Sequence, residues 1–311
     1  LRRNITSTNT SKKDRLWPVL FQWKNVWQGA SMEIRENSIR ACAARLPQGE
    51  GYLALSYVLD TTPGALRAKA DSLLPPEALE RYEAIVARRL HGEPLQYAIG
   101  QWEFYGHLFA VDRRALIPRP ETERLVEIVL DEGVGGQAVA DIGTGTGAIA
   151  LSIALEAQPA PSVVYATDLS REALDLAKEN ATALLQPARA GMVKWIEGDG
   201  PSVLPEAVDV LLSNPPYIDP MHKKNLQAEL SYEPSSALFA GAAGKGGVAL
   251  YEAWIPQLST VLKPRGRVFF EIGDDQGEAV ADLFRAEGFA EVAILQDYTG
   301  RDRMVRARRI V

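Results

Sequence analysis

Alternation between strand-like and helix-like segments, from Gln137 to the end of the chain, is the feature that most limits the possible folds. Short apolar segments alternate with longer segments whose apolar residues recur every three or four positions. Repeated strand–helix units predict a parallel sheet with helices on both faces, and ligands bind such sheets where the strands end. The expected strands cover residues 138–142, 163–167, 193–197, 208–213 and 268–272, the expected helices 147–157, 171–185, 247–262 and 276–287, and an expected terminal strand pair 291–295 and 303–309.

The segment Asp141–Gly147 lies where the first of these strands leads into a helix. Its glycines alternate as G-x-G-x-G after an acid, whereas a nicotinamide dinucleotide site reads G-x-G-x-x-G. Glycines allow a tight turn and let backbone N–H groups approach a ligand closely. The next strand ends at Asp168, whose carboxylate can accept hydrogen bonds from ribose hydroxyls. Asp141 favours S-adenosylmethionine over a dinucleotide, because it can help hold the amino acid end of that cofactor but would repel a pyrophosphate.

The segment Asn214–Tyr217, which reads Asn-Pro-Pro-Tyr, follows the expected strand 208–213. Neither proline has an N–H to donate, so strand pairing stops here and the turn is stiff and extended. The Asn214 side-chain oxygen and the Pro215 carbonyl can accept both N–H bonds of a planar –NH₂ group, and Tyr217 can stack on that group. Such a site acts through orientation and electrostatic preorganisation. The two motifs together predict an S-adenosylmethionine-dependent methyltransferase that acts on an amide or amino nitrogen.

Composition and charge exclude several other classes. The 311 residues suit two domains. A net charge of −6 argues against a protein that binds nucleic acid mainly through phosphate contacts. The single cysteine, Cys42, and three scattered histidines offer no ligand spacing, so no metal is expected. The sequence has no uninterrupted apolar stretch long enough for a transmembrane helix.

The part of the chain before the motifs is expected to form separate regions. Residues 1–31 are rich in Arg, Ser and Thr, and are expected to be a disordered, cloning-derived or targeting extension. Residues 32–100 show a helical pattern interrupted by Pro and Gly, which predicts a small helical bundle for substrate recognition. Aromatic residues around Gly106 predict a β-hairpin linker over residues 101–116. Residues 117–311 would then form the methyltransferase domain.

Several further segments resemble the HemK/PrmC family of protein-(glutamine-N5) methyltransferases, which modify the glutamine of the Gly-Gly-Gln motif in peptide chain release factors. The resemblance covers residues 32–311 and is strongest from Gly92 onward. It implies an α/β fold, with a Rossmann-like class I methyltransferase domain preceded by a small helical-bundle domain and a β-hairpin linker. Besides the two motifs, it rests on Gly92–Tyr97, Glu103–Gly106, Leu116–Glu123, Glu233–Pro234, Glu271–Gly273 and Gly300–Arg303.

The resemblance also implies roles for individual residues. Asn214 would contact both the methyl end of the cofactor and the substrate glutamine, and Asn214, Pro215 and Tyr217 are the candidate catalytic residues. Pro216 would complete the substrate pocket. Gly200 departs from relatives that carry a larger side chain there. The candidate residues for S-adenosyl-L-methionine are Asp141, Gly143, Thr144, Gly145, Thr146, Gly147, Asp168, Asp199, Gly200 and Asn214.

Some residues near the motifs allow two interpretations. Arg119, Glu121 and Glu123 can either cap and pair at a helix start or face the site. Glu271 is expected to be structural, closing the substrate cleft from the neighbouring strand.

The expected function is methyl transfer from S-adenosyl-L-methionine to the side-chain N5 of the release-factor glutamine. Two alternatives use the same motifs, namely methylation of a ribosomal-protein glutamine and N6 methylation of adenine in nucleic acid, which the acidic charge disfavours. A catalytically silent cofactor-binding protein is a third. Release factors are the expected partners of a monomer that binds neither membrane nor nucleic acid. A cytoplasmic location is expected, with organelle targeting through residues 1–31 as the alternative.

Overall fold

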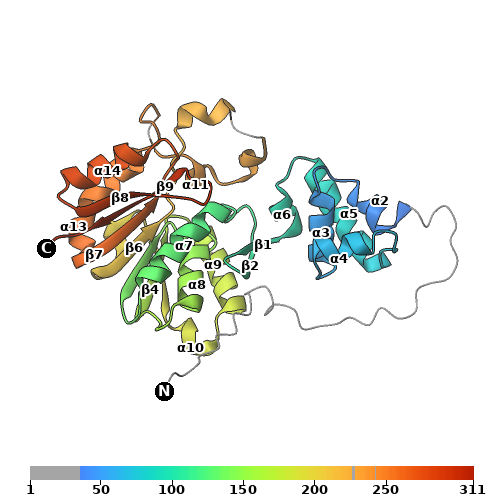
Figure 1. Ribbon diagram of the computed structural model, residues 1–311, viewed down its shortest axis with the longest axis horizontal. Coiled ribbons are helices and arrows are strands. Elements are labelled where there is room, and N and C mark those ends of the chain that lie inside the picture. The colour runs from blue at the N-terminus through green and yellow to red at the C-terminus, as the bar shows by residue number, and fades with distance from the viewer. Residues whose placement is uncertain (1–35, 226–227, 242) are drawn as a thin grey trace, which may run out of the picture. The chain divides into compact units, whose positions relative to one another are not determined.

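The computed structural model describes residues 36–225, 228–241 and 243–311 (Figure 1). The chain divides into two compact units, one ending at Glu83 and the other running from Ala84 to Val311. The predicted extension over residues 1–31 lies outside the described residues. No helix in the described ranges is long and apolar enough to cross a membrane.

The first unit is helical, as its sequence pattern predicts. It contains α2 (Ile39–Ala43), α3 (Glu50–Val58), α4 (Pro63–Ala68) and the start of α5 (Pro76–Leu90). The hydroxyls of Ser38 and Thr62 accept backbone N–H bonds at the starts of α2 and α4, which are ordinary N-caps. Tyr82 is fully buried, and its hydroxyl donates to the carbonyl of Cys42 at 2.8 Å. The predicted domain limit at residue 100 stays a prediction, since the two units meet within α5.

The second unit begins with a hairpin and continues into an α/β sheet domain. Both turn residues of the hairpin, Tyr105 and Gly106, have positive φ, which matches the twist of a two-residue hairpin loop. The elements are α6 (Leu95–Ile99), β1 (Gln101–Phe104), β2 (His107–Ala110), α7 (Pro120–Glu132), β3 (Ala138–Ile142), α8 (Ala148–Glu156), β4 (Val163–Asp168), α9 (Arg171–Leu184), α10 (Pro187–Ala190), β5 (Val193–Glu197), β6 (Val208–Ser213), α11 (Ser235–Leu238), α12 (Ala249–Trp254), α13 (Leu258–Val261), β7 (Leu262–Glu271), α14 (Gly277–Ala286), β8 (Ala290–Gln296) and β9 (Asp302–Arg308), with short 3₁₀ turns η2 (Pro201–Val203), η3 (Pro220–Asn225), η4 (Ala228–Tyr232) and η5 (Ile255–Gln257).

The seven strands of the main sheet run in the order β5-β4-β3-β6-β7-β9-β8. Strands β3 to β7 pair in parallel, and β9 is antiparallel to both β7 and β8. From β3 the chain proceeds outward through β4 and β5, and then returns to place β6 on the other side of β3. The strand order therefore reverses between β3 and β6, and a sheet of this kind binds its ligand at that switch point.

Helices cover both faces of this sheet, as predicted. In β3, Val139 belongs to one buried cluster, whereas Ala140 and Ile142 belong to the cluster on the opposite face. The same alternation occurs in β7, where Phe269 faces the first cluster and Phe270 the second. Helices α7 and α8 contribute to the first cluster, and α12, α13 and α14 to the second. The period-two alternation of a strand divides its apolar side chains between the two faces.

One predicted helix is wrong. The segment 247–262 forms three short pieces, α12, η5 and α13, instead of one helix. Pro256 lies in the middle of it and has no N–H for a helical hydrogen bond, so the regular helix ends before it. Strand β7 also begins earlier than the predicted 268, at Leu262, with an irregular register between Val208 and Val210 of its partner strand.

Candidate active site

Backbone hydrogen bonds, one within the loop and one to β4, hold the glycine loop between β3 and α8 in a tight turn. The Thr144 N–H donates to the carbonyl of Thr167 on the neighbouring strand, and the Gly147 N–H donates to the carbonyl of Thr144, both at 2.8 Å. Gly147 caps α8 with a φ of +82°, and a Cβ there would lie 3.1 Å from the Leu151 side chain and 3.2 Å from that of Ala177. Because the residue combines positive φ with close neighbours, only glycine fits there without strain.

Two acids hold this loop from different sides. Asp141 is fully buried beneath it, where its Oδ2 accepts from the Thr144 hydroxyl at 2.6 Å and from the Ala150 N–H at 3.1 Å. Burial raises the pKa of Asp141 to about 7. Asp168 accepts the Gly145 N–H at 2.9 Å on one oxygen and the Ser170 N–H at 2.8 Å on the other. Asp168 lines the cavity above the loop, whereas Asp141 does not.

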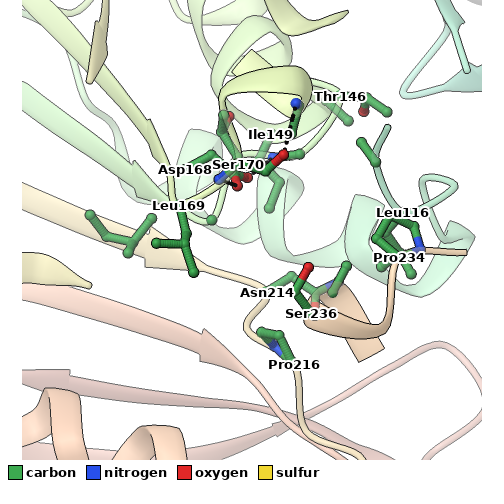
Figure 2. A pocket seen from close by; sticks show the side chains of 18 of the residues that line it. Leu116, Thr146, Ile149, Asp168, Leu169, Ser170, Asn214, Pro216, Pro234 and Ser236 are labelled. Carbon is green, nitrogen blue, oxygen red and sulfur yellow. Dashed lines mark hydrogen bonds between the residues drawn. The ribbon is translucent and has the colours of Figure 1, made fainter. Parts of the chain in front are cut away.

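That cavity has a volume of about 360 Å³ and opens at the carboxyl ends of β3, β4 and β6. Figure 2 shows Asp168, Leu169 and Ser170 on one side of it, with Asn214 and Pro216 across from them. Backbone N–H groups at a helix start, a carboxylate and an apolar wall match the needs of a charged amino acid group, a ribose and a base. The predicted cofactor residues that line it are Gly143, Thr144, Gly145, Thr146, Asp168, Asp199, Gly200 and Asn214.

The wall at Gly200 is completed by Trp254, which lies at the end of α12. A Cβ at Gly200 would lie 2.7 Å from the indole Nε1 of Trp254, and Gly200 has a φ of +69°. Both residues line the first cavity. The Trp254 indole therefore occupies the space that a side chain at position 200 would need. The sequence alone does not indicate this contact, because the two residues are far apart in the chain.

The Asn-Pro-Pro-Tyr turn is anchored at both ends. At the start, the Ser213 hydroxyl donates to the carbonyl of Ile142 at 2.6 Å, which ties β6 to β3. At the end, the buried amide of Gln276 donates to the carbonyl of Tyr217 at 2.9 Å. Gly247 passes so close that a Cβ there would lie 2.0 Å from this carbonyl oxygen. The backbone of the turn is thus fixed by neighbours on three other segments.

A second cavity, of about 640 Å³, adjoins the first. Its lining includes Pro215, Tyr217 and Glu271, together with Asn214 and Pro216, which also line the first cavity. Burial raises the pKa of Tyr217 to about 12, so its hydroxyl is neutral at physiological pH. Asn214 therefore lies where the two cavities meet.

At the start of α7, Arg119 and Glu121 face the cavities, whereas Glu123 does not. Glu123 accepts the backbone N–H of Tyr105 at 2.9 Å and so holds the hairpin turn. Arg119 and Glu121 line the second cavity. Arg119 also pairs with the buried Glu233, whose other oxygen accepts the Ile117 N–H at 3.0 Å. Glu233 thereby fixes the segment that borders both cavities.

Thr122, in the first turn of α7, connects Asn214 to Glu271. The Asn214 amide donates to the Thr122 hydroxyl at 3.1 Å, and this hydroxyl donates to Glu271 at 2.7 Å. Burial raises the pKa of Glu271 to about 7.

The structure brings nearly all the predicted site residues to one place. Asp141 and Gly147 are the exceptions, since they support the loop from behind the cavity surface. Sequence reasoning missed Trp254 and did not assign Thr122 a contact, because neither residue type signals a site by itself. Within the described part of the chain, no three His, Cys, Asp or Glu side chains are grouped to hold a metal ion.

Comparison with known proteins identifies the family. Residues 37–100 match the model of the PrmC N-terminal domain, and residues 121–242 match that of the methyltransferase small domain. The chain is 42% identical to the release factor glutamine methyltransferase of Enterococcus faecalis, over 83% of this chain and 92% of that protein. It is 41% identical to the protein of the same name in Cereibacter sphaeroides, over 82% of this chain and 88% of that one.

A solved structure, the release factor-specific protein-(glutamine-N5) methyltransferase of Alicyclobacillus acidocaldarius, is 30% identical to this chain. The match covers 65% of this chain and 100% of that one, with a TM-score of 0.38. The two Enterococcus and Cereibacter relatives align over most of their own length. The chain therefore belongs to the release factor glutamine methyltransferase family, which is S-adenosylmethionine-dependent.

Proposed function

We propose that this chain transfers a methyl group from S-adenosyl-L-methionine to the side-chain nitrogen N5 of the glutamine in the Gly-Gly-Gln motif of peptide chain release factors. The observation that carries the proposal is the position of Asn214, which lines both cavities. A methyl donor in the first cavity and an amide in the second would meet at this side chain. The relatives' name, release factor glutamine methyltransferase, supports the choice of substrate.

The first cavity is proposed to hold the cofactor, which supplies a methyl group on a positively charged sulfur. The N–H groups of Gly143 and Thr146, and those of Ala148 and Ile149 at the start of α8, suit a carboxylate. Those of Thr144, Gly145, Gly147 and Ala150 already donate within the protein. Each Asp168 oxygen accepts one N–H in the protein, and a carboxylate has further lone pairs for ribose hydroxyls. Asp199 and Gly200 are proposed to lie beside the adenine, with Trp254 as an apolar wall. Asp141 would act from beneath by fixing the loop.

The second cavity is proposed to hold the glutamine amide. An amide nitrogen is a poor nucleophile because its lone pair is delocalised into the carbonyl. The Asn214 oxygen and the Pro215 carbonyl would accept its two N–H bonds and aim the nitrogen at the methyl group, while Pro216 and Tyr217 hold the planar amide. Orientation of this kind can remove a large part of the activation barrier to methyl transfer, so no strong base is needed.

The test is peptide mass mapping of a purified release factor after incubation with the full chain and S-adenosylmethionine. One added methyl group on the Gly-Gly-Gln peptide is expected, and an unmodified peptide at complete cofactor saturation refutes the proposal. Asn214→Ala should lower the transfer rate by roughly 10²- to 10³-fold. The same variant should bind S-adenosylhomocysteine nearly as well as the wild type, because the loop and Asp168 are unchanged.

Two other substrates are separated by a second assay, in which labelled S-adenosylmethionine is incubated with the full chain and with release factor or ribosome fractions. Labelled methyl groups on ribosomal protein and not on release factor would favour a ribosomal glutamine. Label that disappears after nuclease treatment would favour adenine, which the net charge of −6 disfavours. A monomeric state, the absence of nucleic acid binding and a cytoplasmic location stay predictions from the sequence.

A further inference from the structure

The Asn214 side chain of the Asn-Pro-Pro-Tyr turn is the first of three hydrogen-bonded side chains that come from three parts of the chain. Asn214 follows β6, Thr122 lies in the first turn of α7, and Glu271 ends β7. Thr122 and Glu271 are 4% and 1% exposed, so water does not compete for their hydrogen bonds. Glu271 is therefore a buried acid with no part in the proposed methyl transfer, and Thr122 connects it to Asn214, which does take part.

The direction of the hydrogen bonds in this row is set by the single proton of the Thr122 hydroxyl. An ionised carboxylate only accepts, so Thr122 must donate its proton to Glu271 at 2.7 Å. The hydroxyl then has only lone pairs for Asn214, and the amide must meet it with its –NH₂ group, at 3.1 Å. The Asn214 oxygen is thereby turned away from Thr122, and Asn214 lines both cavities.

We propose that Thr122 and Glu271 are positioning residues that fix the Asn214 amide with its oxygen as the acceptor for the substrate nitrogen. The inference rests on the proposed function, and it adds a dependence on the charge of Glu271, which borders the second cavity but takes no part in the proposed transfer itself. If Glu271 carried a proton, it could donate to Thr122, and Thr122 would then donate to Asn214. The Asn214 amide would turn over and present –NH₂ to the substrate –NH₂, and two donors form no hydrogen bond.

The surroundings of Glu271 make this change accessible near neutral pH. Burial raises the pKa of Glu271 to about 7, against the lowering effect of the Thr122 hydrogen bond and of Arg303. Its second oxygen, Oε1, has no hydrogen-bond partner among the described residues. The charged and titratable groups that face it are Arg303 on β9, Arg119 and Glu121 at the start of α7, Tyr217 in the turn and Tyr251 on α12.

The first experiment compares variants of Thr122 in the full chain with release factor as substrate. Thr122→Val keeps the shape and removes the hydroxyl, so kcat should fall by roughly 10- to 100-fold, as expected for a misaligned reacting group. The dissociation constant of S-adenosylhomocysteine should stay within about twofold, because Thr122 borders the first cavity and valine keeps the shape of its side chain there. Thr122→Ser restores the hydroxyl and should restore most of kcat. Thr182→Val, which removes an exposed hydroxyl on α9, is the matched control. Wild-type kcat in Thr122→Val overturns the proposal.

The second experiment needs no substrate and therefore separates this inference from the proposed function. In ¹⁵N-labelled protein, the Asn214 side-chain amide signal is identified by its loss in Asn214→Ala. The signal should move with pH around pH 7 in the wild type and lose this movement in Glu271→Gln, which keeps the shape but cannot ionise. A signal that does not titrate in the wild type, or that still titrates in Glu271→Gln, overturns the inference. If the wild type methylates no release factor, the proposed function fails while this measurement still decides the inference.

Discussion

Gln276 lines neither cavity, yet its replacement should disturb the Asn-Pro-Pro-Tyr turn strongly. Its side chain is 5% exposed and makes three hydrogen bonds to backbone groups, each 2.9 Å long. The amide donates to the carbonyls of Tyr217 and Gly246, and the oxygen accepts the Gly273 N–H. One side chain therefore joins the turn to two loops.

Gln276→Leu keeps a similar volume but leaves these three backbone groups without partners. A buried hydrogen bond contributes about 1 kcal/mol net, so the variant should lose about 3 kcal/mol of the free energy of unfolding. For a domain of this size, each kcal/mol lowers Tm by about 2–4 °C, which gives a decrease of roughly 6–12 °C. Because the backbone of Tyr217 is no longer held, kcat should fall by roughly 10- to 100-fold.

The two quantities are measured by thermal unfolding followed by circular dichroism and by steady-state methyl transfer to release factor. Gln296→Leu is the matched control, because Gln296 is exposed and makes one side-chain hydrogen bond, to Asp302 at 3.2 Å. The control should change the free energy of unfolding by less than about 0.5 kcal/mol. A Gln276→Leu variant with the Tm and kcat of the control would refute the reasoning.

Two further predictions concern the cofactor side. Gly200→Leu should weaken S-adenosylhomocysteine binding in isothermal titration at least about 5-fold. A Cβ there would lie 2.7 Å from Trp254, so the added side chain must move this indole or enter the cavity that both residues line, at a cost to the bound state of about 1 kcal/mol or more. Gly191→Leu, with nothing within 4 Å of its Cβ, should bind normally; equal affinities would contradict the contact. Burial raises the pKa of Asp141 to about 7, above its value of about 3.9 in an unfolded chain. The folded protein therefore holds this proton more tightly than the unfolded chain. The resulting stabilisation is present below about pH 4 and is lost as the pH rises from about 4 to about 7. Asp141→Asn should therefore lose less free energy of unfolding across this window than the wild type in denaturant titrations, and parallel curves would disprove the assignment.

The strands and most helices follow from local pattern because each is written in consecutive residues. The strands Val193–Glu197 and Val208–Ser213 begin and end at the predicted residues. The segment 247–262 was predicted wrongly because its apolar spacing persists through Pro256, although the proline interrupts the helix. A pattern of apolar residues reports burial, and the backbone chemistry of one proline can override it.

The two motifs of the site were also readable from the sequence, since the glycine loop and the Asn-Pro-Pro-Tyr turn each lie within a few consecutive residues. Which side of a loop an acid faces was not readable. Asp141 and Asp168 are both acids at strand ends, yet Asp141 is fully buried and Asp168 lines the cavity. The register of β3 and β4 pairs Asp141 with Ala166, so Asp141 lies two residues deeper in the sheet than Asp168, which ends its strand.

By itself, the sequence determined the kind of sheet, the position of the ligand edge and the residues of the two motifs. Only the tertiary structure decided which side chains hold the motif residues in place. Thr122 and Glu271 are 149 residues apart, and Asn214 and Thr122 are 92 apart, yet they form one row of hydrogen bonds. Local propensity carries no information about such pairs, because they meet only when β6, β7 and α7 pack into one domain.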